Sequence, residues 1–123
     1  MHSAFLILFL IETCLYALAS LAHAGFILED YQHRQAMIAE AVTAAALLLG
    51  LISLVLYRPW SRAAAISAQS FALLGTFVGT FTIAVGIGPQ TTLDYITHAA
   101  MILLLVTGLT WLARDRHPPP GRR

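Results

Sequence analysis

Four long apolar stretches, separated by short polar turns, constrain the fold of this 123-residue chain more than any other feature. The hydrocarbon core of a bilayer is about 30 Å thick, and a helix rises about 1.5 Å per residue, so roughly 20 residues cross it. The stretches that meet this length are, approximately, 4–26, 36–57, 64–87 and 95–113. We therefore predict an all-α, polytopic membrane protein, in which short turns join four transmembrane helices into an antiparallel up-down bundle.

The composition agrees with a chain surrounded by lipid. Hydrophobic residues make up 59% of the sequence and charged residues 11%, against about 25% charged residues in soluble domains. These values exclude a soluble nucleotide-binding fold and a nucleic-acid-binding protein. The one cysteine, Cys14, cannot form a disulfide within the chain, which excludes a disulfide-stapled secreted domain. The expected partner of most of the surface is the lipid bilayer.

The arginines predict the orientation of the bundle. Four alternating spans place both termini and the second turn on one side of the membrane, and that side carries six of the seven basic residues: Arg58, Arg62, Arg114, Arg116, Arg122 and Arg123. The other side has Arg34 only, beside Glu29, Asp30 and Asp94. By the positive-inside rule, both termini are expected in the cytoplasm. The absence of lysine and asparagine favours a bacterial genome, and hence a bacterial inner membrane.

The two ends of the chain need separate interpretations. Residues 114–123 are expected to be a disordered, basic and proline-rich cytoplasmic tail, since Pro118–Pro120 favours an extended conformation. At the other end, Ala22-His23-Ala24 resembles a signal-peptidase site, so the first stretch has an alternative interpretation as a cleaved signal peptide. No lysine or arginine precedes the stretch and Glu12 interrupts it, which favours a retained helix.

Glu12 lies near the middle of the first stretch, where an ionisable group costs roughly 2.5–3.5 kcal/mol on insertion scales. At helical spacing it shares a face with Tyr16, Ala19 and His23, and that face is expected to point into the bundle. One interpretation is a proton relay, in which Glu12 titrates and Tyr16 and His23 lead outward. The other is structural, with a protonated Glu12 hydrogen-bonded to a neighbouring helix.

A second group of polar residues gathers at the outward-facing end of the predicted bundle. His23, Glu40 and His98 are expected at a similar depth, because each lies about one turn inside the end of its span. The full set of candidate ligands comprises His23, His33, Met37, Glu40, Asp94, His98 and Met101. Asp94 also has the position of a helix cap or first-turn acid, which the helix dipole favours.

This set is open to three interpretations. Imidazole and carboxylate together suit zinc, iron, copper or nickel, and the methionines would favour copper. A pair of histidines on different helices, with His23 and His98 the better matched, is the arrangement that holds a haem iron. The alternatives are a proton or ligand relay, or polar residues that only satisfy the loops and solvent at headgroup level.

The third stretch carries small residues at helix-packing spacing. Gly75 and Gly79 form a GxxxG motif, which Gly86 continues, and residues at this spacing allow another helix backbone to approach closely. The partner is either a helix of the same bundle or a second copy of the chain. Polar residues near the cytoplasmic end of the stretch add hydrogen-bonding capacity for buried packing: Ser67, Gln69 and Ser70.

In length, number of spans and a glutamate within the first span, the chain resembles the small multidrug resistance transporters. The resemblance implies an antiparallel dimer in which Glu12 binds cation and proton alternately. The sequence departs from that family in two respects. Its arginine distribution is strongly biased to one side, whereas a dimer of opposite orientations needs a balanced one. The family's aromatic and glycine pattern around the loop of the third span is also not present.

The sequence thus favours a small integral membrane protein with a binding or accessory role. Its hypothetical cofactor is a transition metal ion or haem at the outward-facing end, and its hypothetical protein partner is a larger membrane complex. The competing hypothesis is a small proton-coupled transporter that uses Glu12. A third hypothesis is a scaffold or assembly subunit that associates with a second copy of the chain, as a homo-oligomer, or with a larger complex. In this hypothesis, Gly75 and Gly79 form the association surface. An enzyme is the least supported class, because the sequence contains no nucleophile and general base at a short, recognisable spacing.

Overall fold

The computed structural model describes residues 2–56 and 59–114, and every regular element within them is a helix. The helices are α1 (His2–His23), α2 (Arg34–Val55), α3 (Ser61–Ala84) and α4 (Thr92–Arg114). All four are long and apolar enough to cross a membrane. The predicted all-α bundle of four transmembrane helices is therefore confirmed, and the chain is a multi-pass membrane protein. Of the predicted tail, only Arg114 lies within the described residues.

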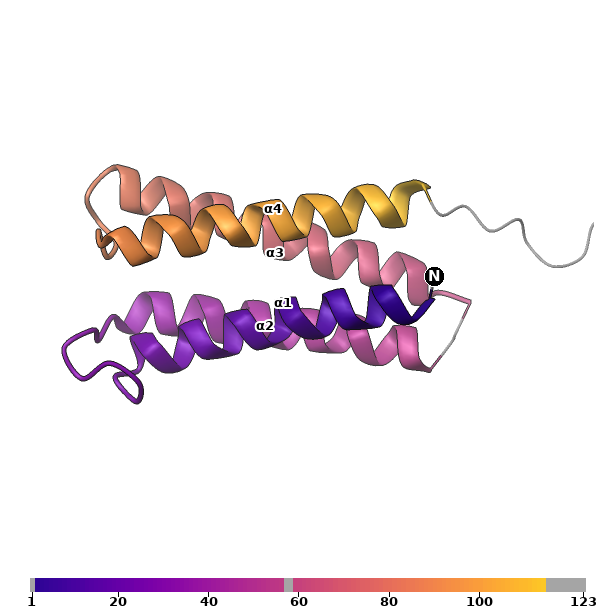
Figure 1. The fold of residues 1–123 in the computed structure, drawn as a ribbon, viewed down its shortest axis with the longest axis horizontal. Coiled ribbons are helices and arrows are strands. Elements are labelled where there is room, and N and C mark those ends of the chain that lie inside the picture. Colours follow the sequence, from indigo (N-terminus) through magenta and orange to yellow (C-terminus); the bar gives the residue numbers. More distant parts are fainter. Residues whose placement is uncertain (1, 57–58, 115–123) are drawn as a thin grey trace, which may run out of the picture.

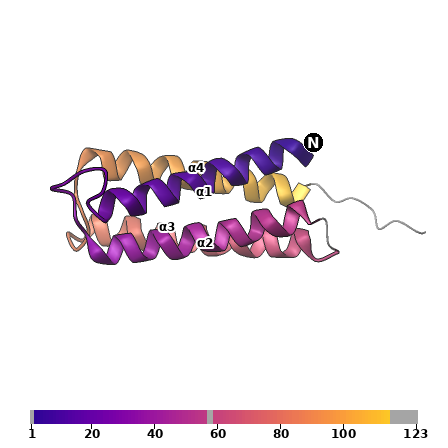
Figure 2. The ribbon, with the colours of Figure 1, turned by 90° about the horizontal axis from the view of Figure 1, so that it is seen from below.

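Successive helices run in opposite directions. The start of α1, the start of α3 and the ends of α2 and α4 lie at one end of the bundle (Figure 1). The loops 24–33 and 85–91 lie together at the opposite end, which we call the mouth (Figures 1 and 2). Short connections leave each helix no room to pack except beside its neighbour in the sequence, which explains the antiparallel order.

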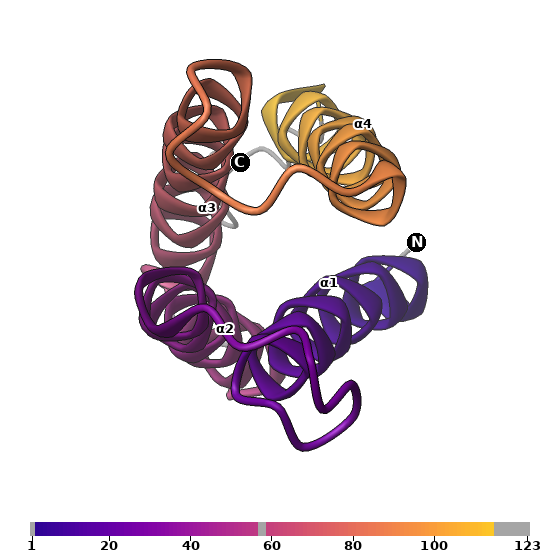
Figure 3. The same cartoon turned by 90° about the vertical axis from the view of Figure 1, so that its left-hand side faces the viewer.

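Viewed from the mouth, the helices form a ring in chain order (Figure 3). Each helix packs against the next, and α1 closes the ring against α4 more loosely than the other neighbours meet. Across the diagonals of the ring, α1 with α3 and α2 with α4, the described backbones do not approach closely. Contact across the ring therefore depends on side chains.

Glycine ends both helices that run into the mouth. Gly25 and Gly86 have φ angles of +83° and +81°, a left-handed conformation that favours glycine. After α1, the amides of Gly25 and Phe26 donate to the carbonyls of Ala22 and Leu21, as in a Schellman motif. The same pattern follows α3. Gly86 therefore corrects one prediction: it lies beyond the end of α3 at Ala84 and shapes the turn rather than packing helices.

Two other glycines allow helices to approach closely. A Cβ at Gly50 of α2 would lie 2.9 Å from both Ala68 Cβ and Phe9 Cε1. A Cβ at Gly108 of α4 would lie 2.2 Å from Nε2 of Gln69 on α3. The outer surface of the bundle is apolar, with side chains such as Leu49, Leu74 and Leu103 about two-thirds exposed, as a lipid environment requires.

Candidate functional site at the mouth

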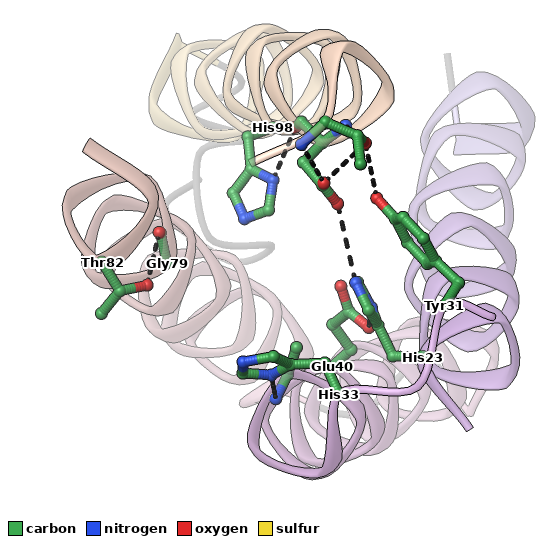
Figure 4. Close-up of polar contacts among 10 residues, drawn as sticks. His23, Tyr31, His33, Glu40, Gly79, Thr82 and His98 are labelled. Atoms are coloured by element: carbon green, nitrogen blue, oxygen red, sulfur yellow. Dashed lines mark hydrogen bonds and ion pairs between the residues drawn. The ribbon is translucent and has the colours of Figure 1, made fainter. Parts of the chain in front are cut away.

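His23, the last residue of α1, lies between two carboxylates at the mouth (Figure 4). Its Nδ1–H donates to Glu40 Oε2 of α2 over 2.7 Å, and its Nε2 lies 3.6 Å from Asp94 Oδ1 of α4. The three residues are 5%, 9% and 3% exposed. Nε2 has no hydrogen-bond partner among the described residues, although a protonated ring would present an N–H to each carboxylate. His23 thus connects α1 to both α2 and α4.

Asp94 is held in place by the start of its own helix. Its Oδ2 accepts hydrogen bonds from the amide and the hydroxyl of Thr91, while its amide donates to Thr91 Oγ1. This reciprocal arrangement is a capping box, which satisfies amides that the first turn of α4 would otherwise leave unpaired. The sequence-based assignment of Asp94 as a first-turn acid is confirmed.

Tyr31 joins the two loops of the mouth. Its ring stacks on His23 with a centroid distance of 5.0 Å, and its hydroxyl lies 2.8 Å from Thr91 Oγ1. Because the Thr91 hydroxyl donates to Asp94, the Tyr31 hydroxyl acts as the donor of this bond. Burial raises the pKa of Tyr31 to about 12, so the hydroxyl keeps its proton at neutral pH.

His33 and His98 have one ring nitrogen each engaged with backbone. Nδ1 of His33 accepts the amide of Ala36 and caps the start of α2. Nδ1 of His98 donates to the carbonyl of Asp94, so Nε2 of a neutral ring keeps a free lone pair. The His98 ring lies over Gly79 of α3, where a Cβ would come within 2.8 Å of Nε2.

These side chains surround a cavity of about 320 Å³, which we call the mouth cavity. All four helices contribute to its walls, with His23, His33, Glu40 and His98 as imidazole and carboxylate groups. Its remaining walls are largely apolar or glycine. No arginine is among the described residues that line it. A volume of this size lies at the lower end of the range for small-molecule sites.

Tyr16 and Thr76 lie at the deep end of this wall. The Tyr16 hydroxyl is hydrogen-bonded to Thr76 Oγ1, which in turn donates to the carbonyl of Ala72, so Tyr16 donates to Thr76. One turn further along α1, Glu12 Oε2 accepts a hydrogen bond of 2.7 Å from Gln69 Nε2. Glu12 and Gln69 are 1% and 0% exposed, which confirms that the Glu12 face points into the bundle.

The predicted ligands come together only in part. His23, His33, Glu40, Asp94 and His98 gather at the mouth, and Met101 lines the cavity. Met37 is not among the residues that line it. No group of three or more His, Cys, Asp or Glu side chains in the described part of the chain is placed to hold a metal ion. A haem iron would have to displace a carboxylate from His23, since both ring nitrogens face one.

The glycines of the GxxxG motif face inward. Gly79 accommodates the His98 ring, and Gly75 lines the cavity, where a Cβ would find its nearest neighbour, Thr43 Oγ1, at 3.6 Å. Sequence reasoning did not identify Tyr31, Thr76 or Thr91 as parts of the site. The spacing of Thr91 and Asp94 is a recognisable capping pattern in the sequence. Tyr31 lies in a loop, and no sequence pattern indicates its role.

Comparisons with protein-family models, with curated proteins and with solved structures found no match.

Proposed function

We propose that this chain is a small multi-pass protein of the bacterial inner membrane that binds a small solute in the mouth cavity. The observation that carries the proposal is a cavity of about 320 Å³ whose wall contains the carboxylate of Glu40, a side chain that is only 11% exposed. Buried ionisable groups in a transmembrane bundle are costly and usually mark a functional site. The cost is only partly offset by the pairing of Glu40 with His23.

The distribution of arginines supports an outward-facing mouth. The opposite end carries Arg62 and Arg114 among the described residues, whereas Arg34 is the one arginine near the mouth. By the positive-inside rule, both termini lie in the cytoplasm and the mouth opens to the periplasm. A solute would then enter from outside the cell.

A cysteine-accessibility experiment tests both the cavity and its orientation. In a Cys14→Ala background, Gly75→Cys places a thiol on the cavity wall, where the nearest atom leaves it room. The matched control is Leu74→Cys, one residue away on the same helix and 66% exposed on the lipid-facing side. The probe is a hydrophilic, membrane-impermeant maleimide added to spheroplasts or to inverted membrane vesicles.

We expect Gly75→Cys to react in spheroplasts and Leu74→Cys to remain unmodified in both preparations. Reaction of Gly75→Cys in inverted vesicles alone would overturn the orientation. No reaction in either preparation, with the protein shown to be folded in detergent, would overturn the cavity as a solute site.

A second candidate function, a small proton-coupled transporter, rests on a different observation. Oε1 of Glu12 and Oε1 of Gln69 are both buried and have no hydrogen-bond partner among the described residues. One proton on Glu12 supplies the donor that these two acceptors lack. Tyr16, one turn from Glu12, lines the cavity, and His23 lines it nearer the end of α1. Protonatable or hydroxyl groups are therefore spaced along the inner face of α1.

This second candidate is tested by proton flux. The purified protein is reconstituted into liposomes that contain a pH-sensitive dye, and an inward proton gradient is imposed. A transporter that uses Glu12 predicts acidification faster than in empty liposomes and a return to the empty rate in Glu12→Gln. Equal rates in the wild type and in Glu12→Gln would eliminate this candidate and leave the binding proposal unaffected.

A further inference from the structure

The polar groups that face the mouth cavity are nearly all hydrogen-bond acceptors. The hydroxyls of Thr43, Thr76 and Thr82 donate to backbone carbonyls of their own helices. The Tyr16 hydroxyl donates to Thr76. Every hydroxyl hydrogen on the cavity wall is therefore already engaged, and what these groups still offer to a ligand is lone pairs.

Glu40 and His98 extend this pattern. Oε2 of Glu40 accepts from His23, while Oε1 has no donor among the described residues, although the side chain is only 11% exposed at the cavity wall. Nε2 of a neutral His98 ring also keeps a free lone pair, because Nδ1–H donates to the backbone carbonyl of Asp94. In Figure 4 the His98 ring and the Glu40 carboxylate face the central opening from opposite sides. The potential donors, His33 and Gln35, lie at the start of α2, at the rim.

The charges favour a cation as well. Glu40 and Asp94 contribute two carboxylates, and His23 between them contributes one positive charge at most, so the group carries an excess of negative charge. No arginine lines the cavity to balance it, as far as the described residues extend. A ligand with several donors and a positive charge would satisfy both the unpaired acceptors and this excess.

The remaining walls of the cavity indicate that the ligand also has an apolar part. Gly75, Val78, Ile83 and Met101 provide an apolar surface. A bare metal ion would leave this surface without a partner, and the described residues offer no three-ligand group for one. We infer that the mouth cavity binds a small protonated organic amine, with the ammonium group at Glu40 and the apolar part against α3. This inference rests on the proposed function, because it names the class of solute that the cavity holds.

The test uses protection of a cavity cysteine by three probes of similar size. The full chain with Cys14→Ala and Gly75→Cys is labelled with the impermeant maleimide in the presence of benzylammonium, benzyl alcohol or benzoate at pH 7. These probes share the ring and differ in charge and donor number. We expect the half-protecting concentration of benzylammonium to be at least about tenfold lower than that of benzyl alcohol, which corresponds to about 1.4 kcal/mol. Benzoate is expected to give the weakest protection.

Glu40→Gln in the same background is the decisive variant, because it removes the charge while keeping the size of the side chain and an acceptor for His23. It is expected to abolish the advantage of the amine over the alcohol. The matched control is Glu29→Gln, which removes an exposed acid in the α1–α2 loop that does not line the cavity, and it is expected to preserve this advantage. An unchanged labelling rate without probe shows that each variant is folded.

The outcomes separate the two proposals. If Gly75→Cys labels normally but the amine protects no better than the alcohol, the amine inference is wrong and the cavity proposal stands. If the amine protects best and Glu40→Gln keeps that advantage, the inference is also wrong, because Glu40 then does not recognise the charge. Failure of Gly75→Cys to label without any probe overturns the proposed function itself.

Discussion

Gly108→Ala tests whether the buried contact between α1 and α3 depends on space that α4 leaves free. Gly108 lies against Gln69, whose amide reaches across the ring to Glu12. An alanine Cβ at this position would lie 2.2 Å from Nε2, 2.6 Å from Oε1 and 2.8 Å from Cδ of Gln69. No Cβ is tolerated at such distances, so the Gln69 side chain must move and its hydrogen bond to Glu12 is lost.

The expected effect follows from opposing contributions. Leaving the Glu12 carboxyl and the Gln69 amide buried without a partner costs about 1–3 kcal/mol. Crowding of the α3–α4 contact adds about 1–3 kcal/mol. Replacement of glycine by alanine in a helix returns at most about 1 kcal/mol, and less where the unfolded chain keeps its helices in detergent. The free energy of unfolding should therefore fall by about 1–6 kcal/mol.

The assay is reversible unfolding in mixed micelles of a mild detergent and SDS, in a Trp60→Phe background, followed by fluorescence of Trp111, which packs against Phe5 where α4 meets α1. Gly75→Ala is the matched control, because its Cβ would find its nearest neighbour at an ordinary contact distance of 3.6 Å. We expect this control to be unchanged or slightly more stable than the wild type.

A double-mutant cycle identifies the cause. In a Gln69→Ala background the obstructing side chain is gone, so Gly108→Ala should lose most of its destabilising effect. The reasoning is refuted if Gly108→Ala unfolds at the same SDS fraction as Gly75→Ala, or if the two changes at 69 and 108 are additive. Either result would mean that Gln69 does not occupy the space beside Gly108.

Substitutions at four further positions probe the polar contacts through the free energy of unfolding or through hydrogen exchange of backbone amides. Glu12→Gln keeps an acceptor for Gln69 and is expected to cost less than about 1 kcal/mol, whereas Glu12→Leu leaves the amide unpaired and costs about 1–3 kcal/mol; equal losses would contradict a neutral Glu12. Tyr16→Phe removes one buried hydrogen bond and should cost about 1 kcal/mol. Burial raises the pKa of Tyr31 to about 12, above its ordinary value of 10, so its contribution is complete below pH 10 and is lost as the pH rises through 12. The difference in stability between the wild type and Tyr31→Phe should shrink over that range. Asp94→Ala removes the carboxylate half of the capping box of α4 and should speed hydrogen exchange in its first turn, while Asp94→Asn, which keeps an acceptor, should change it less.

The sequence was sufficient to predict which residues lie at the same depth. The spans follow from hydropathy and length, and their alternation brings His23, Glu40 and Asp94 to one end of the bundle. Depth alone does not show which side chains meet, because that depends on the rotation of each helix about its axis. The sequence therefore predicted the group of residues but not the pairing of His23 with two carboxylates.

The same limit explains the partner of Glu12. A polar side chain inside a span has to face the bundle, so the orientation of Glu12 was predictable. Its contact with Gln69 runs across the diagonal of the ring, between helices that do not meet along their backbones. The need for Gly108 beside Gln69 depends in turn on that contact, and an isolated glycine in an apolar stretch does not reveal it.

The helices of this bundle are held together in two different ways. Apolar packing alone gives little preference for helix association over contact with lipid, so membrane helices rely on close backbone approach or on hydrogen bonds. α2 and α4 approach their neighbours at Gly50 and Gly108, respectively. α1 contains no glycine and instead carries Glu12, Tyr16 and His23, each with a buried partner on another helix. Substitutions on the inner face of α1 should therefore act through loss of a hydrogen bond. A substitution at Gly50 should act through steric clash, and one at Gly108 through a clash that also breaks the hydrogen bond between Gln69 and Glu12. Because the hydrogen-bonded face of α1 is also a wall of the mouth cavity, the contacts that position this helix are the same contacts that shape the site.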